Sequence, residues 1–158
     1  GGCLTDVRSS EVAARNPSMP HSPRVYDGRL WLLESGHGSL ATFNADQAAV
    51  RTVVNLPGFT RGLDFCGPFA FVGLSQVRES ATFGGLPITD RLAEPDRKCG
   101  VWVVDIRSAQ VVAFLEFLDG VQEIFDVRVL HGVRFPELLD FSDDALQHTF
   151  VVPPRFLE

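Results

Sequence analysis

The chain has 158 residues, of which 45% are hydrophobic and 22% charged, and this balance predicts a packed domain and excludes extended disorder. Lys and Arg number 14 against 20 Asp and Glu, which gives a net charge of −6. This charge argues against partners such as nucleic acid or an anionic membrane surface, because both require a basic face. The three cysteines lack the spacing of a disulfide framework or zinc knuckle, and no apolar run reaches the ~18 residues of a membrane span. We therefore expect a cytoplasmic protein.

Short apolar strands alternate with polar turns along the chain. One strand–turn–strand unit has its turn at Asp6, and related units follow with turns at Asn44 and Asp105. Asp and Asn suit these turns because their side chains hydrogen-bond the backbone two residues further on.

A second kind of hairpin lies between these units. Its turn is closed by Gly28 in the first case and by Gly67 in the second, and we expect a third such turn at Gly132 after a short strand at 127–130. Glycine is favoured there because tight hairpin turns require positive φ. No helix is expected, apart from one turn within 143–148.

Two hairpins of this kind make a four-stranded unit, which is typical of a β-propeller blade. We predict an all-β, β-propeller-like segment over 1–158, with about three four-stranded blades and a loop inserted at 76–98. A single β-sandwich is the alternative. Known rings close with about four to eight blades, so missing N-terminal blades or a second copy would have to complete the ring. We also expect Trp31 and Trp102, on apolar strands, to be buried between blades.

Several stretches also resemble a bacterial family of conserved hypothetical proteins that is catalogued as a domain of unknown function. The stretches that carry the resemblance are MPHSPR at 19–24, LPGFTRGL at 56–63, GLSQVRES at 73–80 and FGGLPI at 83–88. The resemblance covers nearly the whole chain. It implies a propeller-like fold, and it implies that this chain corresponds to the C-terminal half of longer family members. It supplies no catalytic residue.

Polar residues align at the start of each unit's first strand, where a propeller brings successive blades together around its axis. Ser22, Arg61 and Asp126 align in this way, and their preceding neighbours are His21, Thr60 and Phe125. Together with the first residues of the inserted loop, they suggest one polar site. The candidate ligand-binding residues are His21, Arg24, Arg61, Asp64, Arg78, Glu79 and Glu123. The structural alternative is that such residues tie one blade to the next through backbone hydrogen bonds.

These candidates favour a binding or interaction module for a small anionic ligand or a peptide, because arginine forks suit planar anions. The alternative is a metal-assisted hydrolase or lyase that uses His21 with Asp64 or Glu123. We predict no metal site and no cofactor, because His21 lacks a second ligand at HxH or HExxH spacing. A purely structural scaffold is the third hypothesis.

Overall fold

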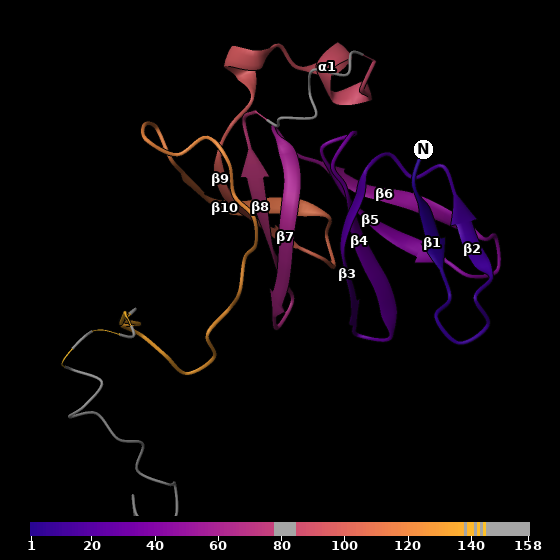
Figure 1. The fold of residues 1–158 in the computed structure, drawn as a ribbon, viewed down its shortest axis with the longest axis horizontal. Coiled ribbons are helices and arrows are strands. Elements are labelled where there is room, and N and C mark those ends of the chain that lie inside the picture. The colour runs from indigo at the N-terminus through magenta and orange to yellow at the C-terminus, as the bar shows by residue number, and fades with distance from the viewer. Residues whose placement is uncertain (78–84, 138, 141, 143, 145–158) are drawn as a thin grey trace, which may run out of the picture.

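The computed structural model describes residues 1–77, 85–137, 139, 140, 142 and 144, and their strands form three antiparallel sheets (Figure 1). A two-stranded sheet joins β1 (Cys3–Thr5) to β2 (Val12–Arg15). The next sheet runs in the order β3 (Pro20–Tyr26), β4 (Arg29–Glu34), β5 (Ser39–Asn44) and β6 (Ala49–Asn55). The last contains β7 (Phe59–Cys66), β8 (Phe69–Ser75), β9 (Gly100–Asp105) and β10 (Gln110–Glu116). The protein is therefore all-β, and its four-stranded sheets are blade-like, as predicted.

The Asp and Asn turns lie at the same place in all three sheets. Asp6 Oδ1 accepts hydrogen bonds from the N–H groups of Arg8 and Ser9, at 2.8 and 2.9 Å. Asn44 and Asp105 cap the β5–β6 and β9–β10 turns in the same way. The β1–β2 hairpin is consequently the counterpart of the third and fourth strands of each complete sheet.

The number of four-stranded sheets differs from the prediction, because the described residues form two rather than three. Residues 127–130 are not a strand, although Gly132 does lie in a turn, with φ of 76°. A strand requires a neighbouring ladder, and no described segment pairs with 127–130. The turns at Gly28 and Gly67 do join first and second strands, as expected.

The inserted segment contains a helix that the sequence analysis missed. α1 (Pro87–Arg91) begins at a proline, which is favoured in the first turn of a helix, and it is followed by a single 3₁₀ turn, η2 (Glu94–Asp96). The helix is too short to show a 3.6-residue pattern, so only its docking on the sheets stabilises it. Part of the predicted turn at 143–148 lies outside the described residues.

The hydrophobic core lies between the two four-stranded sheets. Trp31, from β4, is only 1% exposed and its ring contacts Phe65 of β7 across the sheet boundary, with ring centroids 5.6 Å apart. Trp102 of β9 is 6% exposed and belongs to the same cluster. The predicted burial of both tryptophans is confirmed, and the contact between Trp31 and Phe65 joins one sheet to the next.

Candidate functional site

The first strands of the two complete sheets are interrupted at matching positions. In β3 the pairing register shifts between His21 and Arg24, and in β7 it shifts between Thr60 and Leu63. Such bulges twist a strand and redirect its side chains. The structure thus places His21 at the position of Thr60, and Arg24 at the position of Leu63.

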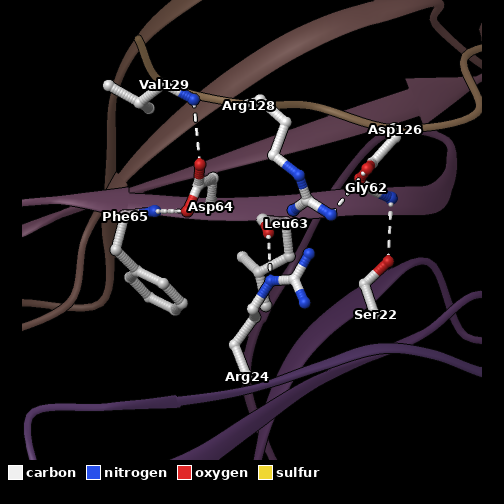
Figure 2. Close-up of polar contacts among 9 residues, drawn as sticks. All are labelled: Ser22, Arg24, Gly62, Leu63, Asp64, Phe65, Asp126, Arg128 and Val129. Carbon is white, nitrogen blue, oxygen red and sulfur yellow. Dashed lines mark hydrogen bonds and ion pairs between the residues drawn. The ribbon is translucent and has the colours of Figure 1, made fainter. Parts of the chain in front are cut away.

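Side chains of β3 tie this strand to β7. The Ser22 hydroxyl accepts a hydrogen bond from the Gly62 N–H at 3.1 Å, and Arg24 Nε donates to the Leu63 carbonyl at 3.2 Å (Figure 2). Ser22 therefore has the structural role that we considered as the alternative. Arg24 combines such a tie with two terminal nitrogens for which the structure gives no partner among the described residues.

The segment 122–129 lies against β7 much as β7 lies against β3. Asp64 accepts a hydrogen bond from the Val129 N–H at 2.9 Å (Figure 2), and the Ser75 hydroxyl accepts one from the Ile124 N–H at 2.9 Å. A Cβ atom on Gly62 would come within 2.7 Å of the Asp126 backbone. The absence of a side chain at this glycine lets the two backbones approach.

Asp64 is held in its ionised form. Burial by itself raises the pKa of this carboxyl group, but the Val129 and Phe65 N–H groups and the charges of Arg128 and Arg24 outweigh that effect and leave the pKa below its ordinary value. A carboxylate that already accepts two backbone hydrogen bonds is a poor general base. Its arrangement favours a structural role over the base or metal ligand that the enzyme hypothesis requires.

Arg128 is a basic residue that the sequence analysis did not include. Its guanidinium forms an exposed ion pair with Asp126 at 2.8 Å. Figure 2 shows the Arg24 and Arg128 side chains approaching the β7 backbone from its two sides, with their guanidinium groups turned toward each other. The alignment of Ser22 with Asp126 already places Arg128 at the position of Arg24, so the repeat alone could have identified Arg128 as a candidate site residue.

Arg61 lies in the same stretch of β7. Its guanidinium carbon is 4.3 Å from the centroid of the Phe125 ring, a cation–π arrangement that leaves the N–H groups at the edge available. The side chain is half-buried. Arg61 therefore packs against the segment 122–129 while keeping hydrogen-bonding capacity.

The remaining candidates are less closely defined. His21 and Glu123 are half-buried, one on β3 and the other in the segment 122–129, whereas Arg78 and Glu79 lie outside the described residues. Within the part of the chain that the structure describes, no group of three or more His, Cys, Asp and Glu side chains is arranged to hold a metal ion.

The inserted segment is anchored at the ends of the sheets where β3 begins and β8 ends (Figure 1). Ile88 is fully buried and its N–H donates to the Gly36 carbonyl. Arg91 donates to the carbonyls of His37 and Leu56, both at 2.9 Å, and burial lowers its pKa. The described part of the insertion thus lies at the same end of the sheets as the first residues of β3.

A cleft of about 600 Å³ opens at the opposite ends of these strands. The turns of both sheets line it, and it contains Tyr26, Asp27, Arg29, Trp31, Gly67, Pro68, Ile106 and Arg107. Arg107 is held by Asp105, whose pKa the ion pair lowers to about 2. No sequence motif marked this cleft, because its walls come from turns that are far apart along the chain.

The repeated hairpins, the sheet order and the matching bulges define an all-β protein built from blade-like antiparallel sheets. Comparison with family models identifies the particular family. Residues 1–139 match the family described as a domain of unknown function (DUF4915), and the chain belongs to that family. No curated protein matches the chain in sequence. None of the helices in the described residues is long and apolar enough to cross a membrane.

Proposed function

We propose that the chain is a binding module that recognises a small anion through Arg24 of β3, Arg61 of β7 and Arg128 of the segment 122–129. The observation that carries this proposal is the approach of the Arg24 and Arg128 guanidinium groups from the two sides of β7 (Figure 2). A guanidinium group offers a planar fork of donors that matches a carboxylate or phosphate.

The local charge supports an anionic ligand. Three guanidinium groups lie along this stretch with two carboxylates, those of Asp64 and Asp126, although the whole chain carries a net charge of −6. Asp64 directs its oxygens at backbone N–H groups, so Arg24 interacts with it only through its charge and forms no ion pair with it. This local excess of one positive charge, in an otherwise acidic protein, favours an anionic ligand.

The test is a calorimetric titration with citrate, a small polycarboxylate, at low and high salt. We expect binding that weakens with salt, and we expect Arg24→Gln and Arg128→Gln each to weaken it by about tenfold, which corresponds to ~1.4 kcal/mol. Arg128→Gln removes an exposed ion pair with Asp126 and a positive charge near Asp64, and because exposed charge pairs contribute little to stability the fold should persist.

The matched control is Arg8→Gln, in the exposed turn between β1 and β2, which should leave citrate binding unchanged. Equal affinities for all three variants, or no heat of binding by the wild-type protein, would overturn the proposal. Binding of a Glu-rich peptide but not of citrate would overturn the small-anion proposal and indicate an acidic peptide instead.

A further inference from the structure

The cleft between the turns of the two complete sheets has walls that hydrogen bonds hold in place. The Tyr26 hydroxyl donates to the Gly67 carbonyl at 2.8 Å, which joins the β3–β4 turn to the β7–β8 turn. The Ile106 N–H donates to the Pro68 carbonyl at 2.9 Å, which fixes the β9–β10 turn beside the β7–β8 turn. Trp31 Nε1 donates to the Tyr26 carbonyl at 3.2 Å. The walls are therefore preorganised, which is typical of small-molecule sites.

One part of the cleft is apolar. Tyr26, Pro68 and Ile106 line it, and each of them is only half-buried. The Tyr26 ring is stacked on Phe65, with the ring planes 6° apart and the centroids 4.4 Å apart, so its orientation is fixed. The volume of about 600 Å³ falls within the roughly 300–1,000 Å³ of small-molecule pockets. A flat aromatic body suits this surface, because aromatic rings gain from offset or edge contacts with one another.

Arg29 brings a positive charge to the same cleft. It pairs directly with Tyr26 in the β3–β4 ladder, and residues paired in this way lie on the same face of a sheet, so the two side chains line the cleft together. Arg29 is exposed, and within the described part of the chain its guanidinium forms no ion pair or hydrogen bond. Its planar fork of donors is therefore available to a carboxylate.

The other charges around the cleft favour a ligand with a single negative charge. Arg107 also lines the cleft, but Asp105 holds it through bonds of 2.8 and 3.1 Å and cancels its charge. Asp27 lies two residues before Arg29 and lines the cleft as well. A ligand with several negative charges would be repelled by Asp27, because like charges brought together disfavour binding. A monocarboxylate needs only the fork of Arg29.

We infer that this cleft is a second binding site and that it takes a monocarboxylate with an aromatic body. Arg29 binds the carboxylate, and the ring lies against Tyr26, Pro68 and Ile106. The site shares none of its lining residues with the site proposed above at Arg24, Arg61 and Arg128, so the inference does not depend on that proposal. The two sites also differ in ligand, because only this one combines a single free guanidinium group with an apolar wall.

The test titrates the protein with phenylpropionate and follows its N–H signals by NMR. We expect the largest shifts at the Gly67 and Ile106 amides and at the Trp31 indole N–H. Arg29→Gln should weaken binding by about tenfold or more, because a charge-assisted hydrogen bond is lost. Its melting temperature should not change, because Arg29 is exposed. The matched control is Arg51→Gln, at an exposed position on β6 of the same sheet, which should bind phenylpropionate as the wild-type protein does.

Two related compounds separate the contributions of charge and ring. Phenylpropanamide keeps the ring but lacks the charge, and acetate keeps the carboxylate but lacks the ring, so each should bind about tenfold or more weakly than phenylpropionate. Equal affinities for the acid and the amide, an unchanged affinity in Arg29→Gln, or no shifts around the cleft would overturn the inference. Loss of binding in Arg128→Gln but not in Arg29→Gln would place the ligand at the other arginines and overturn it as well.

Discussion

Asp64 offers a direct test of how the segment 122–129 is held on β7. Replacing Asp64 by Ala removes the acceptor for the Val129 N–H, at 2.9 Å, and for the Phe65 N–H, at 3.0 Å. A hydrogen bond to a charged group contributes about 1.5–3 kcal/mol. The Phe65 bond is local and water can replace it, so we expect the loss of unfolding free energy to be about 2–3 kcal/mol, set mainly by the Val129 bond.

The pH dependence follows from the sign of the pKa shift. The folded-state pKa of Asp64 lies below its ordinary value, so its stabilising contribution is fully present above the unfolded-state pKa of about 3.9 and is lost as the pH falls through the folded-state value. The difference in stability between the wild-type protein and Asp64→Ala should therefore be constant near neutral pH. It should shrink in acid below pH of about 4.

Urea unfolding, monitored by tryptophan fluorescence, measures the loss of unfolding free energy in Asp64→Ala. Hydrogen exchange at the Val129 amide shows whether this loss arises from the segment 122–129. Asp64→Asn is the matched control, because it keeps one acceptor oxygen and should lose only about half as much stability as Asp64→Ala. Unchanged protection of the Val129 amide in Asp64→Ala would refute the reasoning, since the bond would then contribute nothing to holding the segment.

Two further predictions concern the core and the insertion. Trp31→Ala should lower the unfolding free energy by about 3–5 kcal/mol, because it opens a cavity between the sheets. The control Trp31→Phe should lower it by less. A loss below about 1 kcal/mol for Trp31→Ala in urea unfolding would contradict the burial of this side chain. Arg91→Met should speed hydrogen exchange at the Ile88 amide, because the links of Arg91 to His37 and Leu56 are lost. An unchanged exchange rate at Ile88 would show that Arg91 does not anchor the helix.

Several features of the fold were predictable from the sequence because they depend on local chemistry. The turns at Asp6, Asn44 and Asp105 follow from an Asx side chain that hydrogen-bonds its own backbone. Trp31 and Trp102 lie on strands with apolar neighbours, and their burial follows from the hydrophobic effect. Residue spacing within one hairpin was enough for each of these conclusions.

Other features depend on neighbours that are distant in the sequence. Three of the four residues 127–130 are apolar, but a strand is defined by its ladder, and no described strand pairs with them. The helix α1 forms because Ile88 and Arg91 dock on loops some 35 to 54 residues away. Neither outcome can be obtained from the segment alone.

The candidate site likewise combines features that the sequence predicts with features that only the fold creates. The sequence by itself determined which residues stand at the start of each first strand, because the repeat aligns Ser22 with Arg61 and His21 with Thr60. Only the tertiary structure decided their roles, since it directs the Ser22 and Asp64 oxygens to backbone N–H groups of the neighbouring segment. It also turns the Arg24 and Arg128 guanidinium groups toward each other from the two sides of β7 (Figure 2). The physical reason is that a repeat fixes a residue's position within its own sheet, whereas its hydrogen-bond partners belong to the next one.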